Sequence, residues 1–505
     1  MLSGRKKILS QPFSLSLQNK ASFFSSSGNS RFAGITQLPG YPILGRALDL
    51  LRPNGTLDNL KAAAKVVADD PKGMCYYTVG DKSQLLITNP DHIREFLFDH
   101  RDKQSRMEPM KLLEQLFGSN ILSDPDYLAR KKRIAIRDNY YDAAKLKQHA
   151  KVVAAETYRC RENPGCNGDN IDLTTFCDQF SVRVFLKSAF GAQVTEQDIQ
   201  NVLGFVKYLD EEIFDMKGLA ITMLPPILRH CFFWSKYSNP EKLKNTIKEK
   251  LLTDFLKPKE SLIANTPSLF HDFWKMGGGS NVPFNEHPNM IGDSTMFILG
   301  GYNTTNFTIQ STIKLMGAHP EIQDKLCAEL NKCLQGRQIE EEGTLEQVAQ
   351  IEYLEMVIKE ILRIAPATYH FPRGIDKPFV FQGIPLEKGD TVHISPYIMH
   401  FSKRYWEEPE RFMPERFAKE NAKNIKKFTY IPFGMGAKDC IGQDFAKDVI
   451  RTWLAGVCSQ YRIEVQNNVF DLSLEKGSPK YTHPAQLSLT PLNKEHKHKS
   501  IHLSI

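Results

Sequence analysis

Apolar residues recur with helical spacing through most of the chain, from about residue 112 to 316 and again up to residue 364. Residues three and four apart share one face of a helix, so this periodicity predicts a series of amphipathic helices. The longest is predicted from Met290 to about Met316, and Pro320 is a signal for the start of the next helix. The chain is therefore expected to be mainly α-helical.

A few short segments carry the two-residue alternation of a β-strand instead. Tyr76–Gly80 and Ser83–Asn89 are predicted to form a hairpin, and Pro90 to start a helix directly after it. Phe379–Ser395 alternates in the same way and predicts a small sheet. The expected fold class is mainly α with a small β region.

The two ends of the chain differ from its middle. Residues 1–48 contain no Asp or Glu and are rich in serine, lysine and arginine, which is typical of an organellar transit peptide or of a plain disordered tail. Prolines in Leu38–Gly45 indicate a rigid lead-in, where ordered structure is expected to begin. We therefore expect a disordered or targeting segment over 1–37, one large domain over 38–492 and a polar tail over 493–505.

Composition narrows the classes of function. The formal charge of +7 is a mild excess, and no dense basic run with interleaved aromatic residues indicates a nucleic-acid partner. Nine cysteines without a C-x-x-C pair favour a reducing compartment, cytoplasmic or mitochondrial, over secretion. Since no run reaches the roughly 18–20 apolar residues of a membrane helix, the sequence leaves only peripheral membrane contact open.

The strongest candidate for chemistry is one cysteine among glycines, in FGMGAKDCIG from Phe433 to Gly442. Glycines allow positive φ and a close approach of the backbone to a flat ligand. The sequence after Cys440 predicts a helix, whose N-terminus favours a thiolate. A thiolate is the proximal ligand that pushes electron density from iron toward bound oxygen. The alternative is a buried structural cysteine in a glycine turn.

This motif resembles the cysteine signature F-G-x-G-x-[RH]-x-C-x-G of the cytochrome P-450 superfamily, the haem-thiolate monooxygenases. Matching positions are Phe433, Gly434, Gly436, Cys440 and Gly442, with Lys438 where Arg or His is usual. The resemblance implies the cytochrome P-450 fold, with residues 38–492 as the haem-binding catalytic domain. It also implies heme b (iron protoporphyrin IX) with Cys440 as axial ligand, and cofactor contacts from Phe433, Lys438 and Gly442.

Two further motifs precede the cysteine in the order that the family shows. Glu360 and Arg363 form E-x-x-R, and residues at i and i+3 can pair on a helix. The segment Pro409 to Phe417 resembles the family's PERF motif, and the resemblance implies that Arg416 completes a structural triad with them. Taken alone, E-x-x-R could equally be a surface pair, worth about 0–1 kcal/mol.

The long helix carries Gly300-Gly301-Tyr302-Asn303-Thr304-Thr305, which resembles the family pattern [AG]-G-x-[DE]-T-T. The resemblance implies that the helix opens at Gly301 to make room for oxygen, and that Thr304 relays protons. Asn303 departs from the family, because an amide cannot release a proton although it can orient water.

Weaker matches concern the haem propionates and the substrate. Candidate propionate contacts are Lys132, Arg133 and Arg373. Family analogy implies a hydrophobic small-molecule substrate, such as a lipid, sterol or xenobiotic, and five candidate contacts with it: Met296, Phe297, Gly300, Ala367 and Phe371.

The expected function is a monooxygenase that uses O2 and electrons from a separate ferredoxin or flavoprotein reductase. A basic docking face for such a partner is predicted at Lys438, Lys447, Arg451 and Arg137. Two alternatives stay open. Asn303 motivates a haem-thiolate isomerase, dehydratase or peroxygenase that works without external electrons, and a non-enzymatic haem sensor is the second.

Overall fold

The computed structural model describes residues 30–492 apart from 42–44, 51, 53, 81, 106–113, 115, 125, 163–169, 191–192, 213–239 and 477. Most of the expected targeting segment, and the C-terminal tail, lie outside the described residues. Ordered structure is present upstream of Leu38, where it was expected to begin. Phe32 is buried against Tyr76 with ring centroids 4.4 Å apart, and Arg31 pairs with Asp390 at 3.0 Å.

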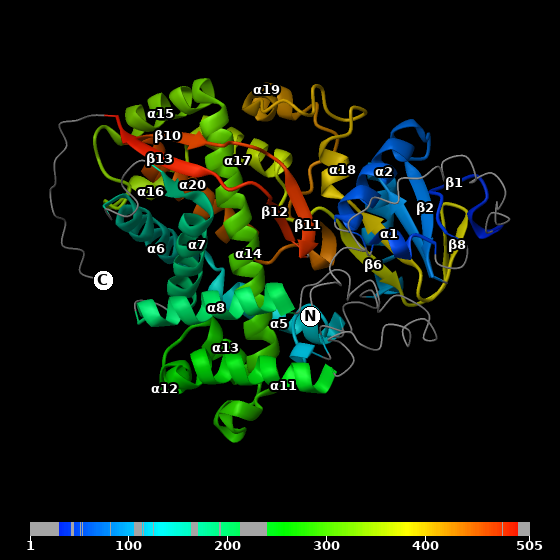
Figure 1. Cartoon of the computed structure of the whole chain (residues 1–505), viewed down its shortest axis with the longest axis horizontal. Coiled ribbons are helices and arrows are strands. Elements are labelled where there is room, and N and C mark those ends of the chain that lie inside the picture. Colours follow the sequence, from blue (N-terminus) through cyan, green and yellow to red (C-terminus); the bar gives the residue numbers. More distant parts are fainter. Residues whose placement is uncertain are drawn as a thin grey trace, which may run out of the picture.

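Helices make up most of the described chain, which confirms the predicted fold class (Figure 1). No helix among the described residues is long and apolar enough to cross a membrane. The α-helices are α1 Ala47–Leu50, α2 Gly55–Asp69, α3 Pro90–Arg94, α5 Asp126–Tyr140, α6 Ala143–Glu162, α7 Leu173–Phe190, α8 Glu196–Glu212, α11 Pro240–Leu251, α12 Glu260–Asn265, α13 Leu269–Met276, α14 Pro288–Ala318, α15 Pro320–Leu334, α16 Thr344–Val348, α17 Glu352–Ile364, α18 Pro396–His400, α19 Lys419–Ala422 and α20 Gln443–Cys458.

The six-stranded sheet lies at one side of the molecule, where β1, β2 and β6 are labelled, whereas β10 and β13 lie among the helices beside α15 and α20 (Figure 1). A six-stranded sheet has the order β1-β2-β3-β9-β6-β4, and β10-β13-β5, β11-β12 and β7-β8 form smaller sheets. The strands are β1 Thr36–Gln37, β2 Met74–Val79, β3 Lys82–Ile87, β4 Gln104–Ser105, β5 Ile171–Asp172, β6 Phe371–Ile375, β7 Phe379–Phe381, β8 Ile384–Leu386, β9 Thr391–Ile394, β10 Tyr461–Gln466, β11 Leu472–Lys476, β12 Ser478–Tyr481 and β13 Gln486–Pro491.

The predicted hairpin is confirmed as the antiparallel pair β2 and β3, with Met74 opposite Ile87. The predicted small sheet over 379–395 is divided between two sheets. Its first half closes on itself as the hairpin β7–β8 around Gly383, which has a φ of 80°, whereas β9 joins the large sheet beside β3 and β6. Alternation therefore identified the strands but not their partners, because pairing depends on segments distant in sequence.

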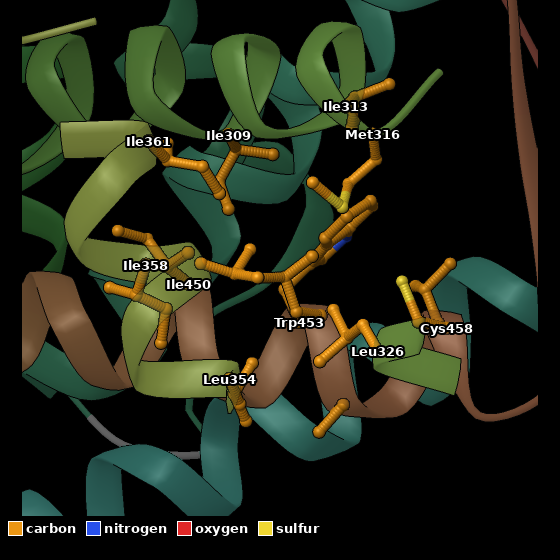
Figure 2. Close-up of a cluster of buried hydrophobic side chains, with 14 of the residues drawn as sticks. Ile309, Ile313, Met316, Leu326, Leu354, Ile358, Ile361, Ile450, Trp453 and Cys458 are labelled. Carbon is orange, nitrogen blue, oxygen red and sulfur yellow. The ribbon is translucent and has the colours of Figure 1, made fainter. Parts of the chain in front are cut away.

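A buried apolar cluster joins α14, α15, α17 and α20 (Figure 2). Figure 2 shows Trp453 of α20 at its centre, with Met316 of α14 above it and Leu326 of α15 beside it. Trp453 and Leu326 have no exposed surface, and burying a large apolar side chain contributes about 1.5–3 kcal/mol. This packing fixes α17, which carries E-x-x-R, against α20, which begins just after Cys440.

Candidate active site

The segment before α20 forms a closed loop around Cys440. The backbone N–H of Cys440 donates to the carbonyl of Phe433 at 2.9 Å, which closes the loop. Gly434 and Gly436 have φ values of 69° and 77°, a region that residues with a Cβ seldom adopt. The glycine pattern of the sequence thus corresponds to the turns that present this thiol.

The thiol of Cys440 lies in surroundings that suit a metal-bound thiolate. Its side chain keeps exposed surface, while burial by the surrounding protein raises the pKa of the thiol. The N–H of Gly442 and the guanidinium of Arg133 both act to lower the pKa of this thiol. A metal ion bound at Cys440 would supply the remaining stabilisation, since a metal-bound thiol loses its proton. The donor set therefore fits the haem iron that the motif implies.

The structure brings Glu360, Arg363 and Arg416 together in the interior. Arg363 donates to both oxygens of Glu360, at 2.7 and 2.8 Å, and Nε of Arg416 donates to Oε1 of the same carboxylate at 3.0 Å. Glu360 and Arg363 have no exposed surface. The remaining donors of both arginines reach backbone carbonyls, including those of Pro409 and Arg411. One carboxylate thus orders two guanidiniums and the backbone around them.

His400 connects this triad to the cysteine loop, a role that a lone histidine in the sequence does not indicate. Its Nδ1 bonds to the carbonyl of Arg363 at 3.0 Å, and its Nε2 accepts the N–H of Ile431 at 3.0 Å. Burial lowers its pKa to about 3, which keeps the ring neutral. The two bonds fix one tautomer, with the proton on Nδ1. The start of the cysteine loop is therefore held by α17 through one imidazole.

The glycine pair in α14 has a different structural reason from the one expected. The helix runs unbroken from Pro288 to Ala318, so the expected opening at Gly301 is not seen. A Cβ on Gly301 would lie 2.3 Å from the ring of Phe185 in α7, whereas a Cβ on Gly300 would have no described atom within 4 Å. The lack of a side chain at Gly301 therefore allows α14 to pack closely against α7, and its lack at Gly300 leaves open space beside the helix. Thr304 lies one turn on and donates to the carbonyl of Gly300 at 2.6 Å.

The residues that flank Asn303 face a carboxylate on another helix. Tyr302 donates to Asp178 of α7 at 2.7 Å, and Asn306 donates to the same oxygen. Burial raises the pKa of Asp178. Positions 302 and 306 lie about 200° around the helix from Thr304, on its opposite side. Asn303 itself is half-buried. The carboxylate that contacts this part of α14 therefore belongs to Asp178 of α7, and it lies on the side of α14 opposite to Thr304.

Of the two propionate candidates on α5, the structure brings one to the cysteine loop. Arg133 pairs with Asp439, next to Cys440, at 2.6 Å. Lys132 lies elsewhere, and its ammonium is 2.5 Å from Asp124 and 2.7 Å from Asp293 of α14. Its side chain is 2% exposed, so two carboxylates already neutralise it inside the protein. Lys132 is therefore a link between α5 and α14 in this structure.

The other cofactor candidates lie around the same loop. Phe371 of β6 lies 3.8 Å from where a Cβ of Gly434 would be, and the guanidinium of Arg373 is 5.2 Å from the Phe371 ring centroid. Lys438 is half-buried in a 3-10 turn of the loop. The Phe433 ring lies 5.6 Å from the ammonium of Lys447. Through the contact between Phe371 and Gly434, the strand β6 that carries Arg373 thus lies against the loop that carries Phe433 and Lys438.

The substrate candidates divide into packed and open positions. Met296 and Phe297 are buried in an apolar cluster, where Phe297 packs on Phe273 with ring centroids 5.0 Å apart. Gly300 is exposed, and Ala367 and Phe371 are half-buried. The last three therefore present more of their surface than Met296 and Phe297, which keep 6% and 7% exposed.

A mainly helical fold, a cysteine loop before a helix and a buried Glu–Arg–Arg triad together define a haem-thiolate class of protein. The family model for cytochrome P450 matches residues 37–491, and the chain belongs to this family. It is similar to cytochrome P450 3A41 of Mus musculus, 37% identical over 414 residues, or 76% of this chain and 78% of the relative. Cytochrome P450 3A9 of Rattus norvegicus is 28% identical over 395 residues, or 73% and 74% of the two chains.

Membership confirms several expectations at the level of the family. The protein is an oxidoreductase, a cytochrome P450 monooxygenase, and its cofactor is haem. The family also implies a hydrophobic substrate, O2 and a reductase as electron source.

Replacing Glu360 with Gln should destabilise the fold strongly. It removes the one carboxylate between Arg363 and Arg416, and a buried charge left without its partner costs about 3–5 kcal/mol. Denaturant unfolding of the purified protein measures this loss. The control is Glu352→Gln, which breaks a pair with Lys419 that is 46% and 85% exposed, and it should cost only about 0–1 kcal/mol. Equal losses would contradict the triad's structural role.

Alanine at the two adjacent glycines of α14 should have opposite effects on stability. Gly301→Ala places a Cβ into the ring of Phe185 and should cost roughly 1–3 kcal/mol. Gly300→Ala meets no described atom within 4 Å and should gain about 1 kcal/mol from helix propensity. Urea unfolding of both variants checks this, and a loss at Gly300 as large as that at Gly301 would contradict the packing argument.

The carboxyl of Asp293 should make stability depend on pH. Burial raises its pKa from 3.8 to about 6. The native state then binds this proton more tightly than the unfolded chain, so the free energy of unfolding falls as pH rises between 3.8 and about 6. Asp293→Asn should remove this slope, while Asp124 still pairs with the ammonium of Lys132. The control Asp91→Asn, at a side chain 73% exposed, should keep the wild-type slope. An unchanged slope in Asp293→Asn would refute the assignment.

Proposed function

We propose that Cys440 is the axial haem ligand of this monooxygenase, and that its substrate is a hydrophobic small molecule such as a lipid, sterol or xenobiotic. The observation that carries the proposal is the connection from the buried triad through His400 to Ile431, nine residues before Cys440. A ligand on a loop needs such rigid support, because a metal bond tolerates little displacement of its donor. When bound, the haem supplies the activation of O2.

The remaining site residues take roles that follow from where they lie. Arg133 and Arg373 offer guanidiniums beside the loop for the haem carboxylates, and Lys438 adds a point charge rather than a bidentate fork. Thr304 holds an exchangeable proton one turn from the open position Gly300. Asn303 can orient water beside it but cannot itself release a proton.

The substrate is proposed to lie against the accessible residues Gly300, Ala367 and Phe371. Their surfaces are apolar, and pockets for small molecules are lined mostly by apolar and aromatic groups. Met296 and Phe297 support this wall from behind, since both are packed in the core.

The electron donor is proposed to be a separate ferredoxin or flavoprotein that docks on a basic face. Arg137 is exposed, and Lys447 is 35% exposed although it pairs with Asp444 at 3.3 Å. Arg451 contributes less net charge, because it pairs with Glu355 at 2.6 Å and also with Asp448. Charge reversal at Arg137 and Lys447 should slow reduction at low salt, and unchanged rates would refute this face.

A second candidate reaction is favoured by Asn303 alone, namely rearrangement or dehydration of a peroxide substrate without external electrons. Turnover of a lipid hydroperoxide in the absence of O2 and reductant would select it. Oxidation that requires both would select the monooxygenase reaction.

The reduced carbon monoxide difference spectrum tests the ligand. The wild-type protein should show the Soret band of thiolate ligation, and Cys440→Ser should lose it because a hydroxyl is not a thiolate donor. Cys333→Ser, which removes another thiol that is not fully buried, should keep the band. A thiolate band that survives in Cys440→Ser would refute the assignment.

A further inference from the structure

One lysine of α14 is buried without a carboxylate partner. The side chain of Lys314 has no exposed surface, and its ammonium forms no hydrogen bond or ion pair with any residue that the structure describes. The other charged residue of α14 is Asp293, which pairs with Lys132 and lies about 30 Å away along the helix at 1.5 Å per residue. Because a buried charge without a counter-ion is costly, either neighbouring groups or the loss of its proton must compensate for it.

Two aromatic rings cover this ammonium. The Nζ atom of Lys314 lies 4.9 Å from the ring centroid of Tyr481 in β12 and 5.6 Å from that of Phe470, on the loop between β10 and β11. The two ring centroids are 6.0 Å apart in an edge-to-face arrangement. Phe470 is the outer ring, since it keeps 40% of its surface exposed. We call these two rings the aromatic cover. Ring faces attract a cation, but less strongly than a carboxylate does in the interior.

The aromatic cover also contacts the part of α14 that carries Thr304. Strand β12 lies beside α14 (Figure 1), and Tyr481 stacks on Phe307 with ring centroids 5.4 Å apart. The hydroxyl of Tyr481 donates to Ser311 at 2.9 Å. Phe307 is three residues after Thr304 and therefore lies on the next turn of the same face. The position of Tyr481 is thus coupled by direct contacts to the turn that follows Thr304.

The charged groups near the aromatic cover do not neutralise Lys314. Lys480 of β12 pairs with Asp210, and Asp471 lies 3.8 Å from His483. Burial lowers the pKa of Lys314, and no charged group on the described elements packed against α14 raises or lowers it further. Besides these groups, the charged residues of β10, which also packs on α14, are Arg462 and Glu464. The proton of Lys314 is therefore the main electrostatic variable of this contact.

We propose that protonation of Lys314 controls how firmly the aromatic cover closes on α14, and thereby the surroundings of the turn that follows Thr304. With a neutral amine, the cover closes over an apolar side chain. With an ammonium, closure buries a charge that two ring faces compensate only in part, so the cover opens more often. The inference concerns a conformational equilibrium of the protein and does not depend on the proposed substrate or electron donor.

The direction of the effect follows from the linkage between proton binding and closure. Burial places the pKa of Lys314 in the closed arrangement below its usual value of 10.5, which the amine regains when the cover opens. The closed arrangement therefore binds the proton less tightly than the open one, and closure becomes more favourable as pH rises through this interval. Within the interval the closing equilibrium should change by up to about tenfold per pH unit.

Hydrogen exchange of the full-length, haem-loaded protein, followed by mass spectrometry of peptides that contain Phe470 or Tyr481, measures the opening. The test compares wild type with Lys314→Met at matched pH, so that the intrinsic exchange rate cancels. At neutral pH the Met variant should exchange more slowly in these peptides, and the difference should shrink as pH approaches 10.5. Lys314→Arg keeps its charge at every pH, so its difference from the Met variant should not shrink.

Lys388→Met is the matched control, because the side chain of this lysine is 75% exposed, and its exchange should equal that of wild type. Equal exchange in wild type and Lys314→Met at every pH would overturn the proposal. A difference that stays the same at every pH would overturn it as well, since it would show an effect of packing without one of protonation.

The connection to the haem site has its own readout. The heterocycle 4-phenylimidazole binds haem iron through a ring nitrogen, and a spectral titration gives its dissociation constant. The ratio of this constant between wild type and Lys314→Met should change over the same pH range as the exchange, because the titration of the heterocycle itself is common to both proteins. A constant ratio beside the expected exchange result would overturn the connection through Tyr481 to the turn after Thr304.

Discussion

The site depends on one buried carboxylate. Glu360 accepts hydrogen bonds from both Arg363 and Arg416, and each arginine uses its other donors on backbone carbonyls of the segment around Pro409 and Arg411. A charge cluster of this kind is costly to bury and therefore tolerates little rearrangement. His400 links this rigid cluster to the cysteine loop. Ion pairs that are remote from Cys440 therefore help to hold it in position.

Apolar packing supplies the second support. Trp453 and the residues around it hold α14, α15, α17 and α20 together, so the helix that carries Thr304 and the one that follows Cys440 belong to one core. The charged triad fixes the loop, and this core fixes the helices on either side of it. A change in either support should therefore reach the cofactor without touching it.

The sequence predicted the mainly helical character of the chain and the strands β2, β3, β7, β8 and β9, because hydrophobic periodicity is local, but it did not predict the strands over Tyr461–Pro491. The sequence also resembles the family at its E-x-x-R and PERF motifs, and this resemblance implied the contact among Glu360, Arg363 and Arg416 that the structure shows. It could not predict that Lys132 turns to Asp124 and Asp293, since a one-residue shift on α5 decides which of two neighbouring cations faces the loop. His400 was missed because its role lies wholly in contacts made by folding. The division of 379–395 between two sheets was missed for the same reason.

The contact between Gly301 and Phe185 has a consequence for how this protein can change over generations. Where α7 and α14 touch, the ring of Phe185 fills the space that a side chain at position 301 would occupy, so the two positions share a fixed volume. A larger residue at 301 should cost less stability where position 185 carries a smaller side chain. The two positions should therefore vary as a pair among descendants of this chain, although they lie 116 positions apart in the sequence.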